Sequence, residues 1–121
     1  MLKKTITYTD YNDEERTEDF FFNLNESELA EMQLTTEGGF KEKLERIVHA
    51  KDQAAIIKAF KEVILAAYGE KSDDGRRFCK SKEISEGFAA TPAYNILFME
   101  LATNEEKASA FINAIIPKVK G

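Results

Sequence analysis

The spacing of apolar residues changes along the chain, from every second position near the N-terminus to helical spacing further on. Residues 5–9 (TITYT) alternate polar and apolar side chains with β-branched residues, which is typical of a half-buried strand. The following Asn12-Asp13 suits a turn, because both residues tolerate left-handed backbone angles. Residues 16–24 (RTEDFFFNL) then return as a second strand. We therefore predict an antiparallel β-hairpin over residues 1–24.

Residues 25–117 carry the signals of helices, and residues 118–121 are expected to fray. Helix start signals are Asn25 with Glu28, Asp52, Ser81, Thr91 with Pro92, and Thr103 with Glu106. Apolar positions at helical spacing are Leu29 and Met32; Phe40, Leu44, Ile47 and Val48; Ile56, Ile57, Phe60, Ile64, Ala67 and Tyr68; Ile84 and Phe88; Phe111, Ile112, Ile115 and Ile116. The predicted fold is helix-dominated α+β: an N-terminal antiparallel β-hairpin followed by a bundle of about five α-helices.

Residues 68–81 (YGEKSDDGRRFCKS) gather carboxylates, arginines and the only cysteine of the chain. As a calcium loop this segment lacks most of the oxygen ligands, and two arginines follow Gly75 directly. We interpret it as a connection between helices, in which Gly69 ends one helix at the C′ position, Gly75 makes a turn and Ser81 begins the next helix. No metal or cofactor is expected here.

Length and composition limit the class of protein further. A chain of 121 residues with 43% hydrophobic and 32% charged residues is expected to form one domain, 1–121, with one core. The net charge of −5 argues against binding to nucleic acid and gives no attraction to anionic lipid. The start, MLKKTITYTD, has no apolar signal region, and no run is long enough for a membrane span. We expect a soluble cytosolic protein.

Catalysis has little support in the sequence. A thiol enzyme would pair Cys79 with His49, the only histidine, but no local signature joins them. His49 near a helix C-terminus is more typical of a residue that interacts with the helix dipole. We find no phosphate loop, nucleophile elbow or histidine cluster. The sequence therefore predicts a protein that is not an enzyme.

Partner binding is better supported, and the candidate residues are Phe21, Tyr94, Phe98, Phe111 and Ile115. Phe21 is the one large apolar side chain on the outward face of the hairpin, whose open edges also invite addition of a strand. The other four lie on two helices that are apolar on most sides. Coverage of Phe21 within its own domain, and burial of the helices in the core, remain the alternatives.

The chain resembles tail assembly chaperones of long-tailed phages and prophages of Gram-positive bacteria. The segments that carry the resemblance are KTITYTDYNDEERTEDFFFNLNESEL, RIVHAKD, AYGEKSDDGRRF and LFMELATNEEKASAFINAIIP, between Lys4 and Pro117. Asp13 departs from the glycine expected after Asn12. These segments indicate lineage, because they contain no catalytic motif.

The resemblance implies a non-enzymatic protein that binds the tape measure protein and recruits tail tube subunits. It also implies action in the host cytoplasm and absence from the mature virion. In many such phages a ribosomal frameshift adds a second domain, and a chain that ends soon after Pro117 corresponds to the short form. Binding to itself or to the extended form is a further option. The alternatives are a structural or connector protein retained in the tail and, less favoured, a small thiol-dependent enzyme.

Overall fold

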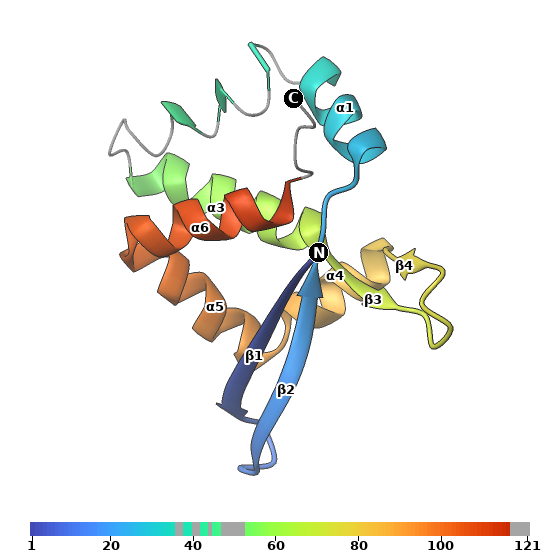
Figure 1. Ribbon diagram of the computed structural model, residues 1–121. Helices are drawn as coiled ribbons and strands as arrows, with labels where there is room; N and C mark the ends of the chain where they lie inside the picture. Colours follow the sequence, from blue (N-terminus) through green and yellow to red (C-terminus); the bar gives the residue numbers. More distant parts are fainter. Residues whose placement is uncertain (36–37, 40–41, 44, 47–52, 117–121) are drawn as a thin grey trace.

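The computed structural model describes residues 1–35, 38–39, 42–43, 45–46 and 53–116. Figure 1 shows a long β-hairpin that projects from a group of helices, with a second, shorter hairpin that projects to its right from beside the base of β2. In chain order the elements are β1 (Leu2–Thr9), β2 (Glu15–Phe22), α1 (Glu26–Thr35), α3 (Gln53–Ala67), β3 (Tyr68–Lys71), β4 (Phe78–Cys79), α4 (Lys82–Ala89), α5 (Pro92–Thr103) and α6 (Glu105–Ile115). The prediction of a helix-dominated α+β fold with an N-terminal hairpin is confirmed.

The predicted hairpin is present with the expected alternation of faces. β1 and β2 pair antiparallel over their whole length, from Leu2 opposite Phe22 to Thr9 opposite Glu15. Asp13 takes a positive φ of 63° in the turn, as predicted. Ile6, Phe20 and Phe22 on the inward face pack into the core, Arg16 and Glu18 on the same face are exposed, and the outward face is mostly polar and exposed.

The predicted all-helical segment after residue 24 contains two further strands, and this part of the prediction is wrong. Helix α3 ends at Ala67, and β3 begins at once with Tyr68. β3 pairs antiparallel with the end of β2, and β4 pairs antiparallel with β3, so that the sheet has the order β1-β2-β3-β4. Tyr68 therefore belongs to a strand, although its spacing fits the apolar face of α3.

Gly69 does not end the helix as a C′ glycine, and its φ is not positive. It lies opposite Phe21 in the sheet. A Cβ built on Gly69 would lie 2.7 Å from the ring of Phe78 and 2.9 Å from the carbonyl oxygen of Cys79. Glycine is needed because β4 lies too close for a side chain. Gly75 has a positive φ of 74°, which confirms the predicted turn between β3 and β4.

Most predicted helix starts are confirmed. Glu28 N–H donates to the Asn25 side chain, and Asn25 N–H donates to the Glu28 carboxylate, which is the expected reciprocal cap of α1. Ser81 and Thr91 accept from the backbone at the starts of α4 and α5. The cap of α6 is Asn104 instead of the predicted Thr103. The predicted apolar helical positions Phe40, Leu44, Ile47 and Val48 and the predicted cap Asp52 lie outside the described residues.

One continuous core joins the hairpin to the helices. Its largest fully buried side chains are Phe22, Leu24, Val63, Ile64, Leu97 and Ile115. Phe22 lies at its centre, with its ring 5.7 Å from Tyr68, 5.7 Å from Phe88 and 5.3 Å from Phe111 between centroids. The inward face of the hairpin is thus held by aromatic contacts from strand and helix alike.

None of the helices in the described part of the chain is both long and apolar enough to span a membrane.

Gly69→Ala should lower the free energy of unfolding by about 1 to 3 kcal/mol, because the new methyl group overlaps Phe78 and the backbone of β4. The control is Gly87→Ala in α4, where an added Cβ meets nothing within 4 Å. That change should stabilise the protein by about 0.5 to 1 kcal/mol, since alanine is the better helix former. Urea titration of both variants measures the two effects. Equal stability of Gly69→Ala and the wild type would contradict the close approach of β4.

Asp10 organises the hairpin turn, and its carboxylate makes the stability of the turn depend on pH. Its carboxylate accepts from Arg16 Nε at 2.6 Å and from the backbone N–H groups of Asn12 and Glu14. These hydrogen bonds, with that of Arg16 the largest, hold the pKa of Asp10 below its ordinary value of 3.8. A lowered folded-state pKa means that the ionised carboxylate stabilises the fold at neutral pH and that this stability is lost as pH falls through the folded-state pKa.

Asp10→Asn should therefore lower the melting temperature at pH 7, and its difference from the wild type should shrink as pH falls below 3.8. Asparagine keeps an oxygen acceptor for the turn but loses the charge that faces Arg16. Asp13→Asn is the control, since it removes a charge from the same turn and asparagine tolerates the positive φ there. Melting curves across this pH range check the prediction, and a difference that is independent of pH would refute it.

Candidate partner-binding site

Two of the five predicted partner-binding residues, Phe111 and Ile115, lie in the core. They are 4% and 1% exposed. The ring of Phe111 packs on Phe22, and the carbonyl of Ile115 accepts from Leu24 N–H at 2.9 Å. Both residues fasten α6 to the end of β2, because a helix apolar on most sides has more than one face to bury. In this structure they offer no surface to a partner.

Tyr94 and Phe98 are half-buried on α5. Their rings lie 5.9 Å apart between centroids, and Tyr94 also contacts Phe88 edge to face at 5.7 Å. Burial raises the pKa of Tyr94. The pair is thus partly used in packing within the domain.

The more exposed apolar side chains of α5 are Ile96 at 41% and Met99 at 49%. The sequence prediction noted the apolar character of the whole helix but did not select these two. Their exposure depends on which neighbours cover α5, which the helix sequence does not specify.

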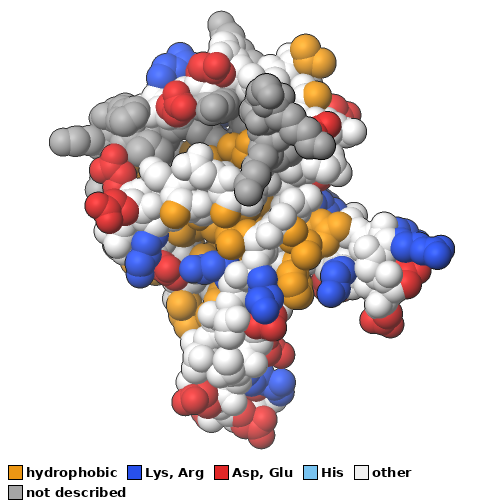
Figure 2. Space-filling model, viewed as in Figure 1, with side chains coloured by type: hydrophobic (Ala, Val, Ile, Leu, Met, Phe, Trp, Pro, Cys, Tyr) orange, Lys and Arg blue, Asp and Glu red, His pale blue; other side chains and the backbone are white. Residues whose placement is uncertain are grey.

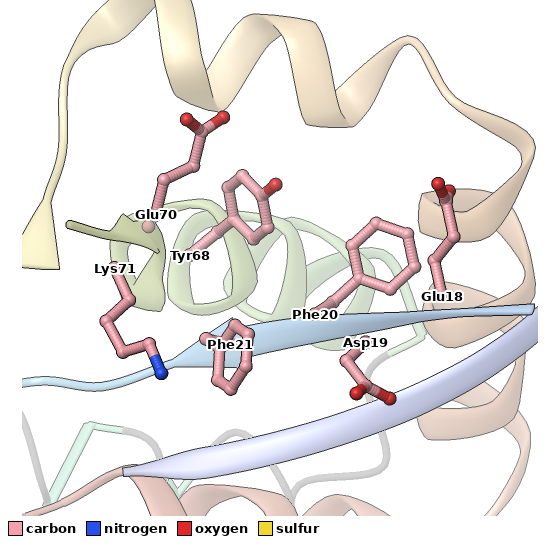
Figure 3. A pocket seen from close by; sticks show the side chains of 8 residues that line it. Glu18, Asp19, Phe20, Phe21, Tyr68, Glu70 and Lys71 are labelled. Carbon is pink, nitrogen blue, oxygen red and sulfur yellow. The ribbon is translucent and has the colours of Figure 1, made fainter. Parts of the chain in front are cut away.

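Phe21 lies where β2 and β3 separate, and this place is the best candidate for a binding site. We call it the fork: Glu18, Asp19, Phe20 and Phe21 of β2 with Tyr68, Gly69, Glu70 and Lys71 of β3. These residues line a hollow of about 320 Å³. Figure 3 shows Phe20, Tyr68, Glu18 and Glu70 on one side of β2, and Phe21, Asp19 and Lys71 toward the other.

The fork exists because β3 changes its partner. β3 pairs with β2 at Tyr68 and Gly69, and its next residues, Glu70 and Lys71, pair with β4. Lys80, directly after β4, holds the second hairpin in place, since its amine donates to Glu28 and to the carbonyl of Asn23, each at 2.6 Å. The first part of β2, Glu15–Asp19, lies beyond this pairing and is exposed.

The inward side of the fork is aromatic. Tyr68 stacks on Phe88 with ring centroids 4.0 Å apart and planes at 11°, and Phe20 lies 5.3 Å from Phe88. Burial raises the pKa of Tyr68, and the nearby carboxylates of Glu70 and Glu18 add to the shift. The tyrosine hydroxyl therefore stays neutral at physiological pH and can donate a hydrogen bond.

The fork continues into a second groove along α4. This groove has a volume of about 610 Å³ and shares Phe20, Tyr68 and Glu70 with the fork. Its remaining lining residues are Ser81, Glu83, Ile84, Gly87, Phe88 and Thr91. Figure 2 shows hydrophobic side chains between the long hairpin and the shorter one, whereas the tip of the long hairpin carries charged side chains.

On the outward side, Phe21 is half-buried. The amine of Lys71 lies 5.5 Å from the centre of its ring, which is a cation–π contact. Asp19 next to it accepts from the hydroxyl of Thr5 at 2.6 Å. The prediction that Phe21 points outward is thus consistent with its place, and lysine and β3 cover it in part.

Carboxylates border both grooves: Glu18, Asp19, Glu70 and Glu83. The ion pairs found among the described residues use other carboxylates, those of Asp10, Glu14, Glu28, Glu86 and Glu100. Glu18 accepts a hydrogen bond from the hydroxyl of Tyr8 and Asp19 from that of Thr5, but no cation among the described residues neutralises the four carboxylates of the grooves. A surface of this kind suits apolar side chains that are accompanied by lysine or arginine.

The described residues include no group of three or more histidine, cysteine or acidic side chains that could hold a metal ion. Cys79 is a free, half-buried thiol on β4. His49, its suggested partner in a thiol enzyme, lies outside the described residues. The geometry thus adds nothing to the thiol-enzyme alternative.

Comparison of the chain with known protein families identifies one that matches nearly its whole length. The sequence pattern of a family of phage tail assembly chaperones matches residues 1–119, so the chain belongs to that family. The predicted resemblance is confirmed, and membership points to a non-enzymatic role in phage tail assembly. Searches of curated proteins and of solved structures gave no match.

Phe21 and Phe22 are neighbours on opposite faces of β2, and they allow a matched test of the site. Phe21→Ser should cost about 1 kcal/mol, because the side chain is only half-buried. Phe22→Ser should cost about 3 to 5 kcal/mol or more, because Phe22 is 0% exposed and contacts three rings. Thermal unfolding followed by circular dichroism compares the two, and similar losses would show that Phe21 is a core residue.

Proposed function

We propose that this protein binds the tape measure protein during phage tail assembly and recruits tail tube subunits to it. The chain belongs to a tail assembly chaperone family, which supports a role in assembly through binding to other tail proteins. The tape measure protein as client and the tail tube protein as second partner follow from the resemblance described above. In this proposal the protein acts in the host cytoplasm and is absent from the mature virion.

The fork is the single observation that carries the choice of binding surface. A chaperone for an aggregation-prone client needs apolar surface that is accessible, and it must itself remain dissolved. Phe21 and Tyr68, each half-buried, provide apolar surface at the fork, and Phe20, which is 9% exposed, adds little to it. The four bordering carboxylates, within a net charge of −5, keep this surface hydrated and repel a second copy of the chain.

Tyr94 and Phe98 remain secondary candidates for client contact on α5. Each is half-buried, so each could contribute part of a ring to a partner. Phe111 and Ile115 are not part of the proposal, because both are buried.

Co-expression with the tape measure protein of the same phage, followed by affinity purification, tests the proposal. The wild type should co-purify with the tape measure protein and keep it in the soluble fraction. Phe21→Ser should reduce the recovered tape measure protein by about tenfold, since loss of a partly exposed aromatic anchor weakens a binding surface by that order. The control is Ile57→Ser on α3, which removes an apolar side chain that is 45% exposed and lines neither groove.

Two outcomes would overturn the proposal. Failure of the folded wild type to bind the tape measure protein would remove the client. Stoichiometric amounts of the protein in purified virions would instead favour a structural or connector role in the tail. Size-exclusion chromatography of the same samples also reports whether the protein binds itself.

A further inference from the structure

β2 has a free backbone edge next to the fork. β3 pairs with β2 at Phe21 and Phe22, and in the described part of the chain no strand lies on that side of Glu15–Asp19. Residues 15–19 are all exposed. A strand edge of this kind presents unpaired N–H and C=O groups that can accept a further strand.

The register shows which backbone groups face this edge. Asp10 N–H donates to the carbonyl of Glu14 at 2.8 Å, which sets the position of the bonded pairs at the start of the ladder. Bonded and non-bonded pairs alternate in an antiparallel ladder. With the observed register, the residues of β2 that bond β1 have even numbers.

The backbone groups of Glu15, Thr17 and Asp19 consequently point away from β1, toward the side of β3. Odd-numbered residues also point this way just after β2, where Asn23 N–H donates to the carbonyl of Ala67 at 2.8 Å. Three successive odd-numbered residues thus form an open edge in line with the pairing of β2 and β3.

The charge of this edge selects the partner. Glu15, Glu18 and Asp19 carry carboxylates, and the one cation, Arg16, is already bound by Asp10 at 2.6 Å. A strand added beside β2 places its side chains alternately on the two faces of the sheet. One face then offers Glu18 beside Phe20, whose ring is 9% exposed, and the other offers Asp19 and the half-buried Phe21, with the amine of Lys71 5.5 Å from the Phe21 ring.

We propose that the edge of β2 from Glu15 to Asp19 receives an extended segment of a partner protein as an added strand, and that this segment carries lysine or arginine around an apolar residue. The inference rests on the proposed function, since the partner is a client of the chaperone. The apolar residue lies beside Phe20 or Phe21, and the cations lie beside the carboxylates of the fork.

A second copy of the chain fits the same edge less well through its own β2. Antiparallel pairing of two β2 edges about Thr17 would oppose Glu15 of one copy to Asp19 of the other, and the opposed Arg16 and Glu18 would compete with the existing Arg16–Asp10 pair. Like charges directly opposite each other destabilise a sheet. The edge is therefore suited to a different, cationic segment.

Proline substitutions at Thr17 and Thr7 test the proposal. Thr7 lies opposite Thr17, and their hydroxyls share a hydrogen bond of 2.9 Å, which both variants lose. Thr7 and Thr17 both have odd numbers, so the backbone N–H of each points away from the partner strand. Each proline therefore removes one N–H at an open edge, a loss that edge strands tolerate. Only Thr17→Pro removes it from the edge beside β3, so Thr7→Pro is a matched control for the strain of proline.

The probe is a short synthetic peptide of alternating lysine and valine, added to the full chain. Binding should slow amide hydrogen exchange at Glu15, Thr17 and Asp19 but leave Lys3, Thr5 and Thr7 on the opposite edge unchanged. Thr17→Pro should weaken peptide binding by about tenfold or more, and Thr7→Pro by less than about twofold. A peptide of alternating glutamate and valine should not bind.

Equal loss of peptide affinity in the two proline variants, or binding without protection of the β2 amides, would overturn the proposal. The outcome is distinguishable from failure of the proposed function when both variants are co-expressed with the tape measure protein. Recovery of that protein by Thr17→Pro at the wild-type level would leave the chaperone role intact and refute strand addition. Melting curves of both variants verify that they are folded.

Discussion

The end of β2 is the point on which the structure depends. Asn23 N–H donates to the last carbonyl of α3, that of Ala67, and Leu24 N–H donates to the last carbonyl of α6, that of Ile115. Phe22, directly before them, is fully buried among three aromatic rings. Two helix C-termini that would otherwise leave carbonyls unsatisfied thus bind one strand end. Further along the hairpin, Ile6 and Phe20 pack into the core and Lys4 pairs with Glu100 of α5, whereas the turn end of the hairpin projects away from the helices (Figure 1).

This arrangement also determines where the candidate site lies. α3 ends against β2, so the chain that follows must begin as a strand beside it. The strand leaves β2 after two residue pairs in order to pair with β4. The fork is the direct result of that change of partner. Phe20 belongs to the core and Tyr68 packs against it, so the inward side of the fork is held by the same aromatic contacts as the core.

Much of the fold could be predicted from local patterns in the sequence. The long hairpin has a clear period of two, and the caps at Asn25, Ser81 and Thr91 have recognisable side chains. β3 and β4 were missed because strands of four and two residues are too short to show a period. Tyr68 moreover continues the helical spacing of α3, and glycine after it resembles a helix end.

The candidate site could be predicted only in part, for the same reason. Alternation along β2 placed Phe21 on the outward face, and its role in binding stays a prediction. The fork itself depends on pairing between Phe21 and Gly69, which no local pattern indicates. Phe111 and Ile115 were selected because of their apolar helix, but burial depends on which elements pack around it.

The pairing of β2 with β3 also has a consequence for the order of folding. The β1–β2 hairpin closes a short loop, whereas Phe21 and Gly69 are far apart in the chain, with α1 and α3 between them. Local contacts form faster than distant ones, so we expect β1 and β2 to pair before β3 reaches β2. During that interval the whole outer edge of β2 is open in the nascent chain. The carboxylates of Glu15, Glu18 and Asp19 then protect the newborn hairpin from pairing with other chains.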